Sequence, residues 1–569
     1  MVDFLDCLDN VAVNDATIGG VQADRNALIE LVKPDIVPYD QPLVIRYQGE
    51  TDAGLAASDP VDIKCVYVSG LDTGLQRDFE RANIVFEIQD AYLQKDGNRA
   101  VSLDYNDTLA NADYIVKRDR DGVWSAMAGV TGTVRAIAQH PITKQIYIGG
   151  DGLNNGADPD ADYLAKWDEA TGTWVAVVAG ITDIVYALAF DLAGNLYIGG
   201  EFTDVGDANG DGIVKFDGSS LSSLDIGLQG IVFKITIDKN GYIWAGGTFL
   251  NAGGDTAADY IAYFNGTAWA NAGGAVAPAV SFITVAPNGY VYFGSKDVTI
   301  PAQHYIYYWD GSARTTLLTM DAVSDSVFDA YFTNDGNMYV IGNFDTINGI
   351  SANYFARYNG QKWEALGDGL NGIGTKIVYY NDKFYLSGTF TSAGDVPLAD
   401  RIAVYLGNGI YQPLDINLPG TPTANDLLFD HLGNLYVGFG TTGDAETAGD
   451  DTITNAGTAK TYPVITVTGP GLLRQIVNTT TGKGMYFNSL TLLAGEVVTL
   501  DLRPGRISMK SNFRGSVLSY VLPGSSYDFP LMPGINRIAT FIDGTTTAAT
   551  KATMQWKENY HGIDGASYA

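Results

Sequence analysis

Short apolar stretches recur along the middle of the chain, and polar turn residues separate each from the next. Residues 163–202, "YLAKWDEATGTWVAVVAGITDIVYALAFDLAGNLYIGGEF", contain four such stretches between turns rich in Gly, Asp, Asn and Thr. Each has the length of a strand, about 4 to 8 residues, and "YLAKWD" and "VYALAFD" alternate along their length. The pattern predicts four antiparallel strands that together make one sheet.

An aromatic residue ahead of a glycine-rich strand end marks a repeat of this unit, as in "NLYIGGEF", "GYIWAGGTF" and "KFYLSGTF". The marker returns at intervals of 46 to 51 residues, at Tyr147, Tyr197, Trp244, Tyr292, Tyr339, Tyr385 and Tyr436. Units of about 40 to 50 residues with four strands are typical of a β-propeller. The repeat therefore predicts a seven-bladed β-propeller over residues 112–445.

Two residue types of the repeat have predicted structural roles. We expect the glycines of "LYIGG" to lie where another backbone approaches closely. Tryptophans occupy matching places in successive units, at Trp124, Trp174, Trp269 and Trp363. Their regular recurrence favours packing between blades over a sugar-binding platform, because binding sites are normally built from irregular loops.

The segments on either side of the repeat have different patterns. Residues 1–111 contain "ADRNALIELVKP", a predicted helix that ends before Pro34, followed by strand candidates, so an α+β domain is expected. Residues 446–569 are a run of short strands and turns that predicts a β-sandwich. The fold class is thus mainly β, with the propeller inserted between an N-terminal α+β hub domain and a C-terminal β-sandwich.

Both flanks resemble one family, the distal tail proteins of siphophages. Residues 67–93, "YVSGLDTGLQRDFERANIVFEIQDAYL", look like the segment that closes the family's N-terminal hub domain. "ITNAGTAKTYPVITVTGPG", followed by "NTTTGK", "AGEVVTLDLRPGR" and "LMPGINRI", resembles the family's C-terminal sandwich in order and spacing. The family has several strands before its helix where this chain has only about 20 residues, so the hub domain is either shortened or completed by another chain.

The resemblance implies a structural protein of the virion. It implies a ring of about six copies at the tail tip, between the tail tube and the fibre or receptor-binding proteins, without enzymatic activity. The propeller would be displayed at the periphery of this ring, where it is a candidate for contact with a host surface glycan. We expect synthesis in the host cytoplasm and a final location at the tail tip of the virion.

Charge and composition narrow the possible partners. The formal charge of −31, from 34 Lys and Arg against 65 Asp and Glu, predicts repulsion from nucleic acid and from anionic membranes. The sequence contains no run of 18 apolar residues, so no membrane span is predicted. Its start, "MVDFLDCLDN", lacks the pattern of a signal peptide. Two separate cysteines, Cys7 and Cys65, predict neither a disulfide framework nor a metal site.

Two other functions fit a propeller. An enzyme is disfavoured, because the four histidines are scattered singly and no Gly-x-Ser-x-Gly elbow occurs. A free-standing carbohydrate-binding propeller, a lectin or adhesin, remains the alternative, although it leaves the C-terminal motifs unexplained.

Two sets of residues are candidates for binding sites. "DVGDANGDGI" places Asp207, Asn209 and Asp211 like the first half of a calcium-binding loop, but the glutamate at position 12 is absent. "GADPDADY" repeats the theme with Asp158, Asp160 and Asp162, and these carboxylates equally suit ordinary turns. The irregular stretch "SKDVTIPAQHYIYYWDG" supplies the candidate glycan contacts, which are His304, Tyr305, Tyr307 and Tyr308.

Overall fold

The computed structural model describes residues 99–560 except 106, 154–160, 275, 277–278, 297–302, 321–324, 395, 398, 400, 415, 419–422 and 444. It also describes the backbone of four earlier strands, β1 (Leu43–Tyr47), β2 (Val61–Ser69), β3 (Val85–Glu87) and β4 (Leu93–Lys95). The helix predicted around "ADRNALIELVKP" lies outside the described residues. In the described part the only helices are two 3₁₀ turns, η3 (Ala252–Gly254) and η4 (Leu518–Tyr520), so this part of the chain is almost entirely β.

Between Ile115 and Phe439 the described residues form seven four-stranded antiparallel sheets. Their strands, sheet by sheet, are β9 (Thr133–Gln139), β10 (Ile146–Asp151), β11 (Leu164–Asp168) and β12 (Thr173–Ala176); β13 (Val185–Phe190), β14 (Leu196–Gly200), β15 (Ile213–Phe216) and β16 (Leu221–Ser223); β17 (Val232–Ile237), β18 (Ile243–Gly247), β19 (Ile261–Phe264) and β20 (Trp269–Asn271); β21 (Val280–Val285), β22 (Val291–Lys296), β23 (His304–Trp309) and β24 (Arg314–Met320); β25 (Ser326–Phe332), β26 (Met338–Asn343), β29 (Phe355–Tyr358) and β30 (Trp363–Ala365); β31 (Gly374–Tyr380), β32 (Lys383–Gly388), β35 (Ile402–Gly407) and β36 (Ile410–Pro413); and β38 (Ala424–Phe429), β39 (Leu435–Phe439), β7 (Ile115–Arg118) and β8 (Trp124–Ala126).

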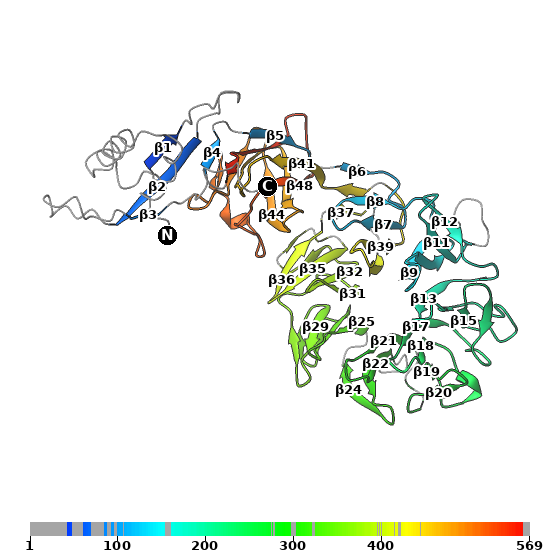
Figure 1. The fold of residues 1–569 in the computed structure, drawn as a ribbon. Helices are drawn as coiled ribbons and strands as arrows, with labels where there is room; N and C mark the ends of the chain where they lie inside the picture. Colours follow the sequence, from blue (N-terminus) through cyan, green and yellow to red (C-terminus); the bar gives the residue numbers. More distant parts are fainter. Residues whose placement is uncertain are drawn as a thin grey trace, which may run out of the picture.

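The sheets are arranged as the blades of a β-propeller. The first strand of each sheet contacts the first strand of the next, in the order β9, β13, β17, β21, β25, β31 and β38, and β38 returns to β9. Figure 1 shows the resulting ring around a central opening. The last sheet combines β38 and β39 with β7 and β8 from the beginning of the ring, so backbone hydrogen bonds close the circle.

The predicted four-strand unit needs one correction. All four strands expected in residues 163–202 are present, but β11 and β12 complete one sheet whereas β13 and β14 open the next. The boundary falls there because β13 stacks on the preceding sheet instead of pairing with β12. The side chain of Val185 on β13 occupies the space beside Gly149, where a Cβ atom would lie 2.4 Å from Cγ1 of Val185.

The repeated aromatic-glycine strand has a physical explanation at each of its positions. In three blades the aromatic residue donates to an aspartate in the preceding turn: Tyr197 to Asp191 (3.4 Å), Trp244 Nε1 to Asp238 (3.2 Å) and Tyr436 to Asp430 (3.2 Å). The first glycine makes room for the next blade. The second glycine faces backbone, since a Cβ atom on Gly247 would lie 1.9 Å from the carbonyl oxygen of Ile231. The prediction of a close backbone approach at these glycines is confirmed.

The recurring tryptophans are core residues. Trp124, Trp174, Trp269 and Trp363 are all buried. Two of them donate through Nε1 to a carbonyl of the preceding blade, Trp174 to Met127 (3.1 Å) and Trp269 to Leu224 (2.8 Å). Their burial and these hydrogen bonds agree with the predicted role in packing between blades.

Several short strands between the blades form small sheets of their own. They are β27 (Thr346–Ile347) with β28 (Ile350–Ser351), β33 (Ser392–Ala393) with β34 (Val396–Pro397), and a three-stranded sheet of β37 (Ile416–Asn417), β40 (Ala445–Thr447) and β6 (Asp107–Leu109). Because β6 precedes the first blade strand and β40 follows the last, their pairing brings the two ends of the propeller together.

Two further sheets form a sandwich beside the ring. One contains β41 (Gly449–Asn455), β48 (Gly534–Asp543), β43 (Gly471–Asn478) and β44 (Lys483–Leu492). The other contains β47 (Gly515–Ser516), β46 (Ser508–Ser511), β45 (Val497–Asp501), β42 (Val464–Thr468), β49 (Lys551–Trp556) and β5 (Arg99–Leu103). A shared apolar core, which includes Ile465, Leu500, Phe529 and Ile542, lies between them.

The sandwich takes strands from both sides of the propeller. β5, which precedes the ring, pairs with β49 near the other end of the chain. In a separate sheet with β1, β2 and β3, β4 pairs with β50 (Asn559–Tyr560). The sandwich also contacts the ring directly. Tyr486 and Leu522 join an apolar cluster of the sheet that contains β36, and Gln412 Nε2 donates to the carbonyl of Gly524 (3.0 Å). In Figure 1 the sandwich accordingly lies next to β35 and β36.

Candidate functional site

The central channel of the propeller is lined by side chains that a backbone irregularity turns inward. Each of the seven first strands has a register shift of one residue, a β-bulge, at the same place. A bulge inserts one extra residue and re-aims its side chain. The extra residues, one per blade, are Arg135, Tyr186, Phe233, Ser281, Phe328, Thr375 and Asn425.

The channel contains two cavities on either side of a narrow collar. The first, of about 410 Å³, is lined by six of the seven bulge residues, and we call it the bulge-side chamber. The second, of about 590 Å³, lies towards the turns that join first and second strands, and we call it the turn-side chamber. Arg135, Tyr186, Lys234 and Asn425 line both chambers and therefore form the collar between them.

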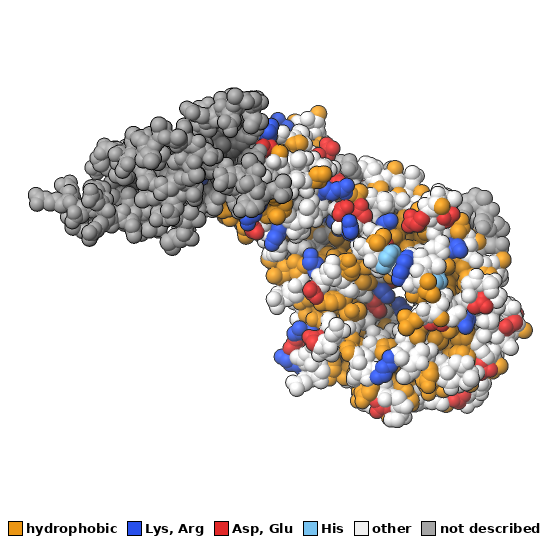
Figure 2. Space-filling view, in the orientation of Figure 1, with side chains coloured by type: hydrophobic (Ala, Val, Ile, Leu, Met, Phe, Trp, Pro, Cys, Tyr) orange, Lys and Arg blue, Asp and Glu red, His pale blue; other side chains and the backbone are white. Residues whose placement is uncertain are grey.

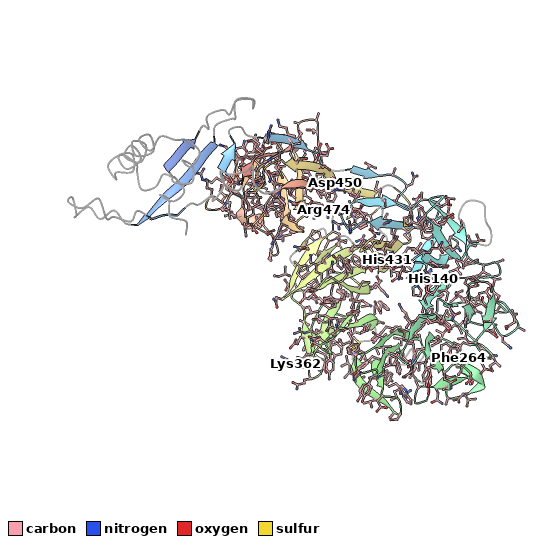
Figure 3. The ribbon with its side chains drawn as sticks, in the orientation of Figure 1. His140, Phe264, Lys362, His431, Asp450 and Arg474 are labelled. Carbon is pink, nitrogen blue, oxygen red and sulfur yellow. The ribbon has the colours of Figure 1, made fainter. Side chains whose placement is uncertain are left out.

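Figure 2 looks into the hollow at the centre of the ring and shows Lys, Arg and Asp or Glu side chains inside it. Figure 3 labels His140 and His431 beside this opening. His431 lines the turn-side chamber, and its Nδ1 lies 3.1 Å from Nε2 of Gln139 on the neighbouring blade. The turn-side mouth is thus the face seen in these views.

Three charged side chains from consecutive blades form a cluster in the channel wall. Lys376 Nζ lies 3.5 Å from Asp329 Oδ2 and 3.5 Å from Asp426 Oδ1. Each carboxylate also accepts a backbone N–H from the next blade, Asp329 from Ile377 (3.0 Å) and Asp426 from Ile137 (2.7 Å). Attraction to Asp329, and then to Asp426, raises the pKa of Lys376 despite its burial. The cluster fastens neighbouring blades to one another.

Lys234 occupies the equivalent position in a blade across the channel, but its surroundings differ. Burial lowers the pKa of Lys234, and attraction to Asp329 only partly offsets this effect. Within the described part of the chain, no ion pair or hydrogen bond joins its ammonium group to another residue. An anionic group that enters the channel would favour the charged form of Lys234, as Asp329 and Asp426 do for Lys376.

Aromatic rings surround both chambers. Tyr186 lies between the guanidinium of Arg135, 5.2 Å from the ring centroid, and the ring of Phe233, 5.2 Å away and nearly perpendicular. At the turn-side mouth Tyr380 stacks on Phe429 with centroids 4.2 Å apart and an interplanar angle of 7°. The channel therefore combines flat apolar surfaces with a few charges, the combination that small-molecule sites use.

The predicted calcium loop has a turn-like geometry. Asp207 accepts the backbone N–H of Asn209 (2.8 Å), and Asp211 accepts that of Asp204 (3.0 Å). The hydrogen bond from Asn209 lowers the pKa of Asp207. Among the described residues, no group of three His, Cys, Asp or Glu side chains is placed to hold a metal ion. Asp158 and Asp160 lie outside the described residues, and calcium binding at Asp207, Asn209 and Asp211 stays a prediction.

The candidate glycan contacts lie on β23, the third strand of its blade. His304 and Tyr307 are buried, and Nε2 of His304 lies 3.3 Å from the hydroxyl of Ser326. Tyr305 stacks on Tyr307 at 5.5 Å, and the half-buried Tyr308 stacks on Tyr290 at 5.8 Å. This geometry favours a packing role for all four residues, and a glycan contact by Tyr305 or Tyr308 stays a prediction.

Sequence reasoning missed the bulge residues, although the repeat contains a signal for them. In "TVRAIA", "IVYALA", "IVFKIT" and "SVFDAYF" the position after the recurring valine changes from blade to blade, and the next position varies as well, with Lys234 and Asp329 in two of the units. Variable positions in an otherwise regular framework are where a repeat protein places its specific contacts. The bulge could be recognised only from the pairing of backbone residues between strands. Every unit contains the same extra residue, so the interval between units does not reveal it.

Comparisons with known proteins find similarity among solved structures. No family model matches the chain, and no curated protein matches it. Among solved structures, the chain is similar to YCF48 bound to D1 peptide, with 14% identity, a TM-score of 0.39, and 63% of this chain and 98% of that one covered. It is also similar to the WD40 β-propeller domain of Doa1, with 14% identity, a TM-score of 0.40, and 61% and 97% covered. A third similar structure is the computationally designed Ika8 protein, with 17% identity and a TM-score of 0.34, where 55% and 98% are covered.

The chain therefore contains a β-propeller, and this conclusion rests on its own sheet topology. Among the described residues, no helix is long and apolar enough to span a membrane.

Proposed function

We propose that this protein is a structural subunit of the tail tip of a tailed virus. It forms part of the ring between the tail tube and the adsorption apparatus, and it performs no catalysis. In this proposal residues 112–445 are a seven-bladed propeller inserted between an N-terminal hub domain, residues 1–111, and a C-terminal sandwich, residues 446–569.

The observation that carries the proposal is the pairing of strands from before and after the propeller. β5 and β49 lie side by side in one sheet of the sandwich, although more than 400 residues separate them in the chain. β6 and β40 then bring the entry and exit of the propeller together. A host domain that is continuous across an insertion has this topology, because its own sheet must close without the inserted part.

The stretches that resemble distal tail proteins occupy structural positions in the sandwich. "LMPGINRI" opens β48 with Asn536, which is fully buried. Its side chain accepts the backbone N–H of Met532 (2.8 Å) and donates to the carbonyls of Met532 (2.7 Å) and Gly534 (3.2 Å). The asparagine therefore fixes a loop of the sandwich, which gives this motif a structural role in the domain.

A basic apolar edge, defined here as residues 502–527, supports self-association into a ring. This stretch contains four Lys and Arg and no Asp or Glu, and two of the four, Arg503 and Arg514, form ion pairs with Asp501 and Glu496 just before it. It includes β47, the last strand of the six-stranded sheet, and the exposed side chains of Ile507, Phe513 and Leu518. An exposed strand edge with apolar residues is a typical docking surface, and the proposed occupant is a second copy of the chain.

Sedimentation velocity of the purified full-length chain tests this function. The proposal predicts a ring whose mass is about six times the 60.8 kDa of one chain, and electron microscopy should show propellers as peripheral knobs. A lectin or adhesin predicts a monomer that binds sugar. A monomer at all accessible concentrations, without assembly on tail tubes, would contradict the ring.

A further inference from the structure

Two cations at the collar of the channel have incomplete partners. Within the described residues Lys234 makes no ion pair, in contrast to Lys376, which lies between two carboxylates. Nε of Arg135 is buried without a hydrogen-bond acceptor in the described structure. The ionic contact of Arg135 is a long one, 3.7 Å from Nη2 to Oδ2 of Asp151.

The two cations face the same space. Arg135 and Lys234 both line the bulge-side chamber and the turn-side chamber. A group bound at the collar is therefore next to both side chains. The side chain of Arg135 is 34% exposed and Lys234 is half-buried, so both basic groups are open to the channel. An anion bound at the collar would gain attraction from both.

We propose that the collar binds the carboxylate of a small organic acid, of the class of acidic monosaccharides. Lys234 and Arg135 hold the carboxylate, and the aromatic rings that line the bulge-side chamber, Phe233 and Phe328, pack against an apolar face of the sugar. This inference goes beyond the proposed structural role, since it gives the propeller a ligand whether or not the chain forms a ring.

The groups that line the collar favour a carboxylate. Asp329 and Asp426 are already bound by Lys376 and by backbone N–H groups of the next blade, whereas Lys234 has no ion-pair partner among the described residues. Guanidinium and carboxylate also suit each other in geometry, since Arg donates in a planar fork.

The size of the chambers agrees with a monosaccharide. Volumes of about 410 and 590 Å³ lie within the range of about 300 to 1,000 Å³ that small-molecule sites occupy. The site is also distinct from the candidate contacts on β23, of which His304 and Tyr307 are buried in blade packing.

Calorimetric titration of the full-length protein with glucuronate, and with glucose as a neutral control, tests the proposal. We expect glucuronate to bind with a Kd between roughly micromolar and millimolar and glucose to bind at least about tenfold more weakly, because glucose lacks the charge. Equal binding of the two sugars, or no binding of glucuronate, would overturn the proposal.

Substitutions locate the site. Lys234→Met keeps the length of the side chain and removes its charge, and it should weaken glucuronate binding at least about tenfold, the effect of losing one charge-assisted hydrogen bond. Lys362→Met is the matched control, because Lys362 lies on the outer rim of the ring with 70% of its side chain exposed (Figure 3). Unchanged affinity in Lys234→Met would overturn the assignment to the collar.

A second substitution covers the case in which Lys234→Met fails to fold, as judged by circular dichroism. Arg135→Gln keeps a hydrogen-bond donor and removes the positive charge, and we expect it to weaken glucuronate binding at least about tenfold as well. Affinity equal to that of the unsubstituted protein would contradict the proposal. Both readouts measure binding to a single chain, so their outcome is independent of whether the protein assembles into a ring.

Discussion

The propeller and the C-terminal sandwich solve the problem of folding a β protein in different ways. The propeller repeats one solution in which a glycine and a valine from the next blade meet in successive blades, joined in three blades by an aspartate-bound aromatic residue. The sandwich has no such repeat, and its buried polar side chains, among them Arg474, Asn478, Glu496 and Asn536, each occupy a unique place. A repeated framework leaves single positions free to vary, whereas a unique network makes each of its members indispensable.

The propeller and the sandwich also differ in their content of charged residues. Residues 112–445 contain 16 Lys and Arg against 36 Asp and Glu, while residues 446–569 contain 10 against 9. A strongly acidic surface keeps a displayed domain soluble and apart from its copies. A balanced surface with a basic apolar edge suits contact between copies. The difference agrees with a sandwich that assembles and a propeller that remains peripheral.

The largest expected effect of a single substitution concerns the buried network of the sandwich. Asn536→Ala removes a side chain that bonds to the backbone of Met532 and Gly534, and to the amide of Asn478 at 3.3 Å. Leaving these buried groups unpaired should lower the free energy of unfolding of the sandwich by about 3 kcal/mol. Denaturant unfolding measures this change. Asn488→Ala, at an exposed position, should stay within about 0.5 kcal/mol, and an equal effect in both variants would contradict the assigned role.

Gly247→Ala should have the next largest effect and should act on the propeller alone. Its Cβ atom would lie 1.9 Å from the carbonyl oxygen of Ile231, which belongs to the backbone and has little freedom to move. We expect a loss of about 2 kcal/mol, as for other overpacked sites. Gly440→Ala is the control, because its nearest neighbour is the side chain of Thr133 at 3.3 Å. Differential scanning calorimetry should show a lower melting temperature for Gly247→Ala only.

The two regions should also respond to opposite extremes of pH. Burial, together with Asp191, raises the pKa of Tyr197 to about 12, above its usual value of 10.0. The folded propeller therefore keeps a proton that the unfolded chain releases, and its stability is complete below about pH 10 and declines as the pH rises through about 12.

In the sandwich, burial opposes ionisation of Glu496, but hydrogen bonds from Arg514 and Ser511 hold its pKa below the usual 4.5. Its contribution is present above about pH 4.5 and is lost as the pH falls below that value. Thermal melts between pH 3 and 12 measure both trends. A sandwich transition that is insensitive to acid would contradict the role of the Glu496 and Arg514 pair.

The smallest effect on folding, and a specific effect on assembly, is expected at the basic apolar edge. Phe513 is 56% exposed, so Phe513→Ser should change the free energy of unfolding by less than about 0.5 kcal/mol. It should nevertheless weaken association between copies, because exposed aromatic residues are enriched among interface contacts. Leu192→Ser, in an exposed turn of the propeller, is the control. Equal sedimentation of the two variants would show that Phe513 lies outside the interface.

The propeller could be predicted from the sequence because the same packing contacts, and therefore the same residue types, recur in each blade. The aromatic markers all lie on second strands, from Tyr147 on β10 to Tyr436 on β39. The sheet boundary was wrong by two strands, since the alternation of polar and apolar residues shows where strands are but not which neighbours they pair with. The collar residues Arg135 and Lys234 could not be predicted, because they come from different blades and line the same channel only when the ring closes.

The most direct test of the account is the assembly state of a chain without its propeller. Residues 112–445 are deleted and replaced by a short Gly/Ser linker between the ends that β6 and β40 already hold together. The mass of the product is measured by sedimentation beside that of the full-length chain. An insertion into a ring-forming sandwich predicts a soluble oligomer with the same number of copies as the full-length protein. An insoluble product, or a monomer where the full-length chain is an oligomer, would contradict it.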